Sequence, residues 1–166
     1  HPDQVKFAQR LEDDLQRRDF TINAVAMNKD GQISDPFEGQ EDLKKKIVHA
    51  VGNAEERFNE DALRMMRGVR LASQLGFAIE PATLEAIRKN NQLLKVISAE
   101  RIRDELVKII NSDLADQGIE LLRQTELMPH VIPELLEGVG VEQNLHHIYT
   151  VWEHNVRALK YTAEQN

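Results

Sequence analysis

The chain has 166 residues and a net charge of −7 at pH 7, and 41% of its residues are hydrophobic and 30% charged. This length and composition indicate a folded, soluble globular protein with one core or two small adjoining cores, and exclude a disordered chain. No apolar run reaches about 18 residues and there is no cysteine, which excludes a membrane span, a disulfide framework and a thiolate metal site. We expect a cytoplasmic protein.

The N-terminal part predicts a small amount of β-structure. Residues 4–16 have apolar side chains at helical spacing and predict a helix. Alternation over residues 22–27, a Lys-Asp-Gly turn and Ile33 then predict a β-hairpin. A short helical turn after Gly39 and one more strand at 47–51 complete this part. Because so few short strands do not form a stable sheet alone, we predict that residues 1–52 are the end of a β-containing domain.

Residues 53–76 predict one long amphipathic helix. Asn53 is the expected N-cap and Gly76 the expected end. At about 100° per residue, one third of the helix surface is charged and the opposite side is apolar. The charged residues are Arg57, Glu60, Asp61, Arg64 and Arg67.

Asp61 and Arg64 are three residues apart, so on a helix their side chains point the same way. They offer a carboxylate acceptor beside a planar donor group. Cytosine and adenine place an amino donor next to a ring-nitrogen acceptor and match this pair, whereas guanine and uracil present the reverse pattern. The alternative is an ordinary surface salt bridge worth a few tenths of a kcal/mol.

After residue 52 we expect helices and no strand. Helices are predicted to begin at Pro81, after Ser98, near residue 113 and near Tyr149, with a looser stretch around 133–140. Residues 53–140 thus predict a helical unit, and 141–166 the start of a further helical region. Residues 87–110 have a local surplus of three positive charges despite the acidic total. The predicted fold class is α+β.

Four segments resemble the bacterial-type (class II) CCA-adding enzymes and the related poly(A) polymerases in order and spacing. They are RRDFTINAVA (17–26), DPFEG (35–39), EDALRMMRGVRLA (60–72) and ERIRDEL (100–106). The resemblance implies a partial β-sheet of a nucleotidyltransferase head followed by a predominantly α-helical neck. It also implies transfer of CMP and AMP from CTP and ATP to an RNA 3′ end, most naturally that of tRNA, with release of pyrophosphate and no membrane partner.

The resemblance assigns roles to individual residues. A motif that contacts the ribose and the triphosphate would comprise Arg17, Arg18, Asp19 and Thr21. This agrees with the chemistry, since arginine binds phosphate oxygens and a carboxylate accepts from a ribose hydroxyl. A nucleotide-selecting template would have Asp61 and Arg64 facing the base edge, and Arg67 would also bind the nucleotide. A hinge between head and neck would have Asp35 and Gly39 as its fixed points, and Arg101 and Glu105 would brace the template.

The sequence departs from the family in its metal ligands. The family's chemistry uses a glycine–serine turn and an Asp-x-Asp pair that hold two Mg²⁺ ions, and neither motif occurs here. Asp13-Asp14 belongs to a predicted helix, and Asp113 and Asp116 flank a helix start. We therefore expect a fragment that contains no catalytic residue and is inactive alone, with Mg²⁺ bound by the N-terminal part of its parent.

Residues 145–161 resemble the opening helix of an HD-type metal-dependent phosphohydrolase domain. His154 would be a metal ligand only if such a domain follows, and we expect no metal site in this chain. We interpret His146 and His147 as loop residues. Two alternatives remain for the function: a poly(A) polymerase of the same family, or a non-catalytic helical RNA-binding module, which the acidic net charge would favour.

Overall fold

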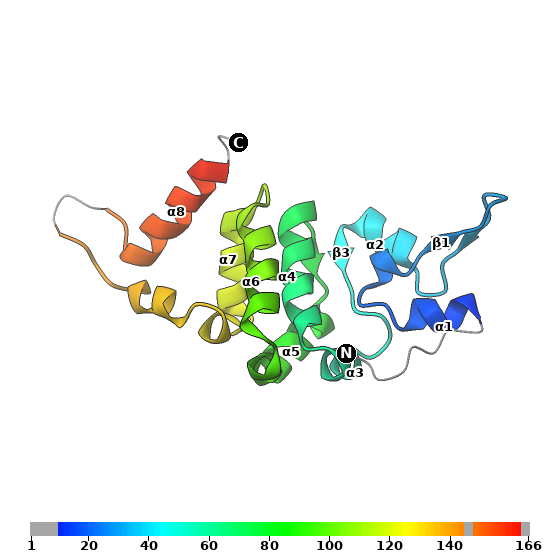
Figure 1. The fold of residues 1–166 in the computed structure, drawn as a ribbon. Helices are drawn as coiled ribbons and strands as arrows, with labels where there is room; N and C mark the ends of the chain where they lie inside the picture. The colour runs from blue at the N-terminus through cyan, green and yellow to red at the C-terminus, as the bar shows by residue number, and fades with distance from the viewer. Residues whose placement is uncertain (1–9, 145–147, 164–166) are drawn as a thin grey trace.

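The computed structural model in Figure 1 describes residues 10–144 and 148–163. The N-terminal portion lies at one end of the molecule, a group of packed helices forms the middle, and the last helix lies at the other end. The described elements are mostly helical, with two small two-stranded sheets, so the α+β class is confirmed. Within the described ranges, no helix has the length and apolarity needed to cross a membrane.

The N-terminal portion contains α1 (Leu11–Gln16), the 3₁₀ turn η1 (Thr21–Asn23), β1 (Ala26–Met27), β2 (Ile33–Ser34), α2 (Gly39–Lys45) and β3 (Ile47–Val48). The hairpin is confirmed, because β1 and β2 pair antiparallel with Met27 opposite Ile33. The helix predicted for residues 4–16 is present from residue 11, and residues 4–9 lie outside the described ranges.

The first predicted strand is wrong over residues 22–23, which belong to η1 (Thr21–Asn23). Two contacts bend the chain there. The Thr21 amide donates to the His49 carbonyl at 2.9 Å, and the Thr21 hydroxyl donates to Asp42 at 2.7 Å. Because its partners lie on α2 and just after β3, residue 21 is held by tertiary contacts that its local sequence does not reveal.

The helical part contains α3 (Ala54–Glu60), α4 (Leu63–Leu75), β4 (Ala78–Ile79), α5 (Pro81–Asn90), η2 (Asn91–Val96), α6 (Ala99–Ile110), α7 (Ala115–Gln124), η3 (Met128–His130), η4 (Pro133–Gly138) and α8 (Val151–Ala163). Helix α4 is its centre and packs against α6 and α7, while α3 packs against α5 and α8 against α7. The helices predicted from Pro81, after Ser98, near residue 113 and near Tyr149 are confirmed.

The single helix predicted for residues 53–76 is wrong, because the chain breaks between α3 and α4 at Asp61 and Ala62. Asp61 is extended, with φ −150° and ψ 104°. Its Oδ1 accepts from the Leu63 amide at 3.1 Å and so satisfies a donor at the start of α4. The two outer ends are as predicted: Asn53 caps α3 with its side chain, and Gly76 ends α4 at φ +65°.

The expectation that no strand follows residue 52 is also wrong. Strand β4 pairs parallel with β3, with Ile47 opposite Ala78 and Val48 opposite Ile79. Two residues are too few to produce an alternating pattern, which explains why the sequence did not reveal this strand. The pairing makes α3 and α4 the connection between two neighbouring strands, and thereby fixes the end of the N-terminal portion against the helices.

One hydrophobic core joins the N-terminal portion to the helices. Phe20 and Val48 belong to the same cluster of buried side chains as Phe58 and Met65. Phe20 is fully buried, and its ring approaches α4 at Gly68, where a Cβ would lie 2.9 Å from Cζ. The RRDF segment is therefore packed directly onto α4.

Candidate functional site

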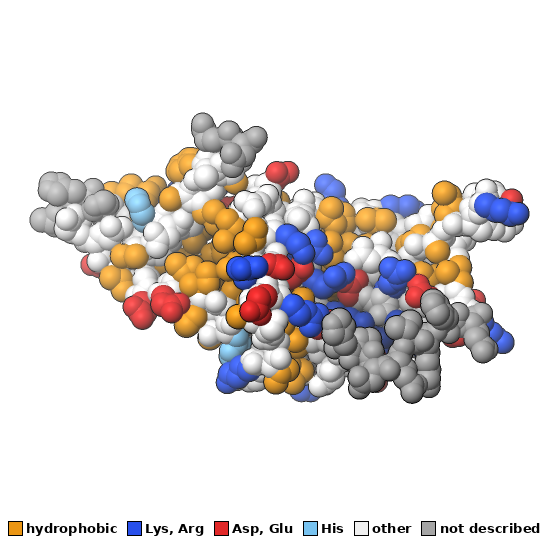
Figure 2. All heavy atoms as spheres, viewed as in Figure 1, with side chains coloured by type: hydrophobic (Ala, Val, Ile, Leu, Met, Phe, Trp, Pro, Cys, Tyr) orange, Lys and Arg blue, Asp and Glu red, His pale blue; other side chains and the backbone are white. Residues whose placement is uncertain are grey.

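A cleft of about 640 Å³ lies where the segment around residues 17–23 meets α4 and the start of α6. Six arginines and two aspartates line it, a surplus of four positive charges. Figure 2 shows Lys and Arg side chains gathered near the middle of the molecule, with Asp and Glu side chains among them. The lining residues are Arg17, Arg18, Asp19, Asn23, Asp61, Leu63, Arg64, Arg67, Arg70, Leu71 and Arg101. A concave surface with this charge suits a polyanion.

Asp19 forms the buried end of an ion pair with Arg67. Its Oδ2 lies 2.6 Å from Arg67 Nη2 and 2.7 Å from Nε, and its Oδ1 accepts from the Asn23 amide group and the Phe20 backbone. Burial alone would raise the pKa of Asp19, but the hydrogen bond from Asn23 and the Arg67 guanidinium outweigh it and lower the pKa. Asp19 is thus a fixed carboxylate acceptor in the wall of the cleft.

Only part of the RRDFT motif lines the cleft. Arg17 and Arg18 line the cleft together with Asp19, and Arg18 also pairs with Asp14 at 3.0 Å. Thr21 is 2% exposed, does not line the cleft, and donates to Asp42. Its contacts are those of a residue that holds η1 against α2.

Asp61 and Arg64 both reach the cleft, although they do not share a helical face. Each forms an ion pair with another residue. Asp61 Oδ2 accepts from Arg101 Nη2 at 2.8 Å, and Arg64 Nη1 donates to Glu60 at 2.8 Å. Arg64 also donates from Nη2 to the Arg17 carbonyl at 2.8 Å. The break after α3, rather than helical periodicity, brings the two side chains to one wall.

Helix α6 contacts this wall at two points. Arg101 holds Asp61, and one turn further Glu105 lies with its Oε2 2.8 Å from Arg70 Nε and its Oε1 2.8 Å from Lys108 Nζ. Glu105 is 4% exposed, so its charge depends on these two cations. Arg70 lines the cleft but was not among the predicted site residues. Its position one turn after Arg67 is the sequence signal that could have indicated it.

Asp35 and Gly39 do not line the cleft; Gly39 is the first residue of α2, and Asp35 precedes that helix. Asp35 accepts from the Gly39 amide at 2.7 Å and from the Gln40 amide at 2.9 Å. A Cβ on Gly39 would lie 2.1 Å from the Thr21 carbonyl oxygen. The DPFEG segment therefore packs α2 against the residue that follows the RRDF segment.

The described residues contain no cluster of metal-ligating side chains. Within residues 10–144 and 148–163, no three His, Asp or Glu side chains gather so that they could hold a metal ion. His154 lies exposed on α8. His146 and His147 lie outside the described residues.

Two family models match the chain, and each matched range contains at least one residue that lines the cleft. The poly A polymerase head domain matches residues 1–49, and the "probable RNA and SrmB-binding site of polymerase A" matches residues 76–138. The fold and these matches define a piece of a polymerase of this type, covering the end of the head and the RNA-binding neck region. The chain belongs to the family of CCA-adding enzymes and poly(A) polymerases.

Similar curated relatives in this family are CCA-adding enzymes. That of Lactobacillus helveticus is 54% identical over 130 residues, which cover 78% of this chain and 33% of the relative. That of Limosilactobacillus reuteri is 58% identical over 109 residues, which cover 66% of this chain and 27% of the relative. The chain therefore spans about a third of the length of the curated relatives it matches.

Solved structures agree with this assignment. The Bacillus stearothermophilus CCA-adding enzyme in complex with CTP superposes with a TM-score of 0.75 and 49% identity, over 76% of this chain and 32% of that one. A tRNA nucleotidyltransferase complexed with a primer tRNA and an incoming ATP analog gives a TM-score of 0.70 and 29% identity, over 84% of this chain and 43% of that one.

Proposed function

We propose that the whole protein carrying this chain adds CMP and AMP to the 3′ end of tRNA and releases pyrophosphate. The observation that carries the proposal is the cleft in which the RRD residues, Asp61 and Arg64 meet. Its positive surplus suits a nucleoside triphosphate. The similar structures, one bound to CTP and one to a primer tRNA with an ATP analog, support CTP, ATP and tRNA as the ligands.

In this proposal the RRD residues bind the sugar and phosphates of the incoming nucleotide. The guanidinium groups of Arg17 and Arg18 hold phosphate oxygens, since their planar donor forks match that geometry. Because its four acceptor positions are occupied in the described contacts, Asp19 accepts from a ribose hydroxyl in place of one of its two contacts with Arg67. Arg67 holds Asp19 in place and keeps 40% of its side chain exposed, so it also reaches the nucleotide.

Asp61 and Arg64 then select the base. An ionised carboxylate has about four acceptor positions, and the described contacts of Asp61 are one hydrogen bond to each oxygen. It can therefore also accept from the amino group of cytosine or adenine, while Arg64 donates to the adjacent ring nitrogen. Guanine and uracil would place a donor against Arg64 and an acceptor against Asp61, and both mismatches are costly in a cleft.

The remaining predicted residues would support this arrangement. We propose that Asp35 and Gly39 form a hinge between the head end (1–52) and the neck (53–140), with residues 141–166 beginning a further helical region. We also propose that Arg101 and Glu105 brace the base-selecting wall. The Arg101–Asp61 and Glu105–Arg70 ion pairs support that role.

Phosphoryl transfer of this kind uses metal ions that neutralise the developing charge. The described residues contain no group of three or more His, Asp or Glu side chains that could hold a metal ion, and we propose that another part of the whole protein binds Mg²⁺. The isolated chain should then be inactive.

The test is nucleotide incorporation by the whole protein with Mg²⁺ and a tRNA that lacks its 3′ CCA. We expect CMP incorporation from labelled CTP alone, and AMP incorporation once CTP is also present. Repeated AMP incorporation without CTP would instead support a poly(A) polymerase, the second candidate that the family models favour. No incorporation of either nucleotide would overturn the proposal in favour of a non-catalytic RNA-binding module. Extension by the isolated chain above a no-protein control would contradict its predicted inactivity.

A further inference from the structure

Arg57 is a partly buried arginine of α3 that does not line the cleft. Its side chain is only 11% exposed. Its Nη2 lies 2.7 Å from Glu60 Oε1, and its Nη1 donates to the Gln16 carbonyl at 3.0 Å. Its Nε is buried without a hydrogen-bond partner among the described residues, which is unfavourable. The two contacts that Arg57 does make must offset that cost.

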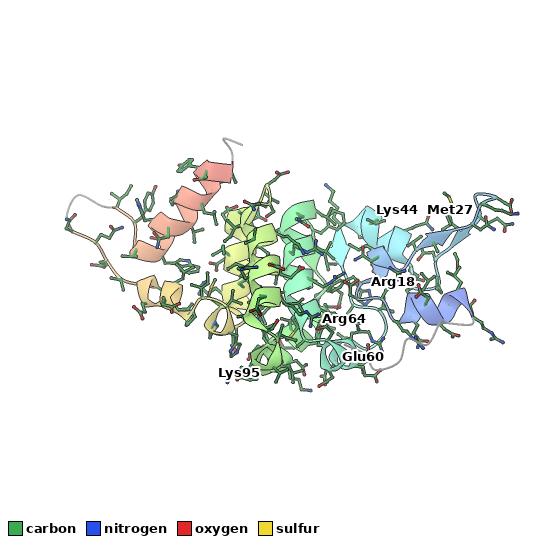
Figure 3. The ribbon with its side chains drawn as sticks, viewed as in Figure 1. Arg18, Met27, Lys44, Glu60, Arg64 and Lys95 are labelled. Atoms are coloured by element: carbon green, nitrogen blue, oxygen red, sulfur yellow. The ribbon has the colours of Figure 1, made fainter. Side chains whose placement is uncertain are left out.

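Arg64 makes the same two kinds of contact as Arg57: it binds Glu60, and it binds the backbone carbonyl of the residue after Gln16. Its Nη1 donates to Glu60 Oε2 at 2.8 Å and its Nη2 to the Arg17 carbonyl at 2.8 Å. Arg64 Nη1 also lies 3.2 Å from the carbonyl of Arg57 itself. One carboxylate thus holds two guanidinium groups, and these bind the carbonyls of consecutive residues, 16 and 17. Figure 3 labels Glu60 and Arg64 at this junction, with Arg18 beside it.

We propose that Arg57 is a positioning residue for base selection, acting through Glu60 on Arg64. The inference rests on the proposed function and assigns a role in it to a residue outside the cleft. Glu60 is 47% exposed, so without Arg57 its carboxylate can rotate toward water and no longer fixes Arg64. Arg57 also fixes the backbone immediately before Arg17 and Arg18. The base-selecting wall and the phosphate-binding segment therefore keep one relative position.

Precise placement matters here because a displacement of about 1 Å can reduce a rate by two orders of magnitude. Arg64 keeps its backbone contacts when Arg57 is replaced, so we expect a smaller effect, a loss of about tenfold in selectivity. Lysine has a single point charge and no planar fork, and it cannot hold both Glu60 and the Gln16 carbonyl in the same geometry. Arg57→Lys should preserve folding better than selectivity.

The alternative is that Arg57 only fastens α3 to the N-terminal segment. Arg88 is the matched control for that role. It also pairs with a glutamate three residues away, Glu85 at 3.6 Å, and donates to a distant carbonyl, that of Gln124 at 2.9 Å. It does not line the cleft. Loss of Arg88 should therefore affect stability alone.

The experiment uses the whole protein, with tRNA lacking its 3′ CCA as primer. The ratio of kcat/KM for CTP to that for UTP is measured together with the melting temperature. We expect Arg57→Met to lower this ratio about tenfold, and Arg88→Met to leave it at the wild-type value. In an Arg64→Met background, Arg57→Met should produce no further loss of the ratio, because it acts through the residue already removed.

An unchanged ratio in Arg57→Met, or an equal loss in the Arg64→Met background, would overturn the inference. If Arg57→Met does not fold, Arg57→Lys takes its place in the same comparison. A wild-type protein that extends tRNA without preferring CTP over UTP would overturn the proposed base selection itself, and this inference with it. A wild-type preference that survives in the Arg57 variants would overturn the inference alone.

Discussion

Replacement of Gly39 by alanine tests how the DPFEG segment is built into the fold. Gly39 opens α2 outside the left-handed region of φ, so alanine can adopt its backbone conformation. The obstacle is space, because a Cβ would lie 2.1 Å from the Thr21 carbonyl oxygen and 2.7 Å from a Val25 methyl group. Since ordinary contacts begin near 3.5 Å, α2 or residue 21 must move by about 1.4 Å.

That movement is resisted by the contacts of Thr21. Its amide donates to the His49 carbonyl at 2.9 Å and its hydroxyl to Asp42 on α2 at 2.7 Å. Overpacking costs about 1–3 kcal/mol, and a hydrogen bond lost in the process adds about 1 kcal/mol. We expect Gly39→Ala to lower the free energy of unfolding by about 3 kcal/mol, and Gly39→Val to lower it further.

The measurement is denaturant-induced unfolding of the whole protein, with Gly31→Ala as the control. Gly31 has φ +80° and no atom within 4 Å of the added Cβ, so its replacement carries only the backbone cost. That cost is about 1–2 kcal/mol. If Gly39→Ala were no more destabilising than Gly31→Ala, the close approach of α2 to Thr21 would be refuted.

Two further predictions concern the RRDF segment. Asp19→Asn should lower the stability at pH 7 by about 1–3 kcal/mol. Burial alone would raise the pKa of Asp19, but the contacts with Asn23 and Arg67 outweigh it and lower the pKa. The charged Asp19 therefore stabilises the fold at pH values above the ordinary carboxyl pKa, and this stabilisation is lost as the pH falls through the lowered pKa of the folded state. Unfolding measured from pH 7 downward should thus show the gap between wild type and variant closing in acid, and a constant gap would contradict this. Phe20→Ala should cost about 3–5 kcal/mol, because the ring is fully buried against α4; a denaturation midpoint near that of wild type would show that the ring does not anchor the segment.

The sequence predicted those features that a residue's own chemistry determines. An asparagine such as Asn53 can accept hydrogen bonds from the backbone amides at the start of a helix. A glycine such as Gly76 readily takes a positive φ, and a proline such as Pro81 suits the first helical turn. The break at Asp61 was not predictable in this way, because the apolar spacing continues through Ala62 and Met65. The contacts that hold the break come from the Leu63 amide and from Arg101, 40 residues away.

In the candidate site, too, local sequence motifs were predictable and long-range contacts were not. Motif resemblance indicated most of the charged residues that line the cleft and the bracing residue Arg101, but not Arg70 or the other contacts that orient the lining residues. Arg64 binds the carbonyl of a residue 47 positions earlier, and Arg67 binds a carboxylate 48 positions earlier. Thr21 belongs to the motif yet bonds to Asp42 and lies away from the cleft. The partners in these long-range contacts depend on how the N-terminal segment packs on α4, and local sequence patterns do not contain that information.

Base selection by Asp61 and Arg64 is tested most directly by measuring kcat/KM for CTP, ATP, UTP and GTP in the whole protein and in its Asp61→Ala and Arg64→Ala variants. An unpaired polar group costs about 1–3 kcal/mol, or roughly tenfold to a hundredfold in selectivity. Asp61→Ala should therefore relax discrimination against UTP and GTP by that factor while the protein still extends tRNA. Arg64→Ala should weaken the use of CTP and ATP together. If both variants keep the wild-type ranking of the four nucleotides and lose only stability, Asp61 and Arg64 do not select the base.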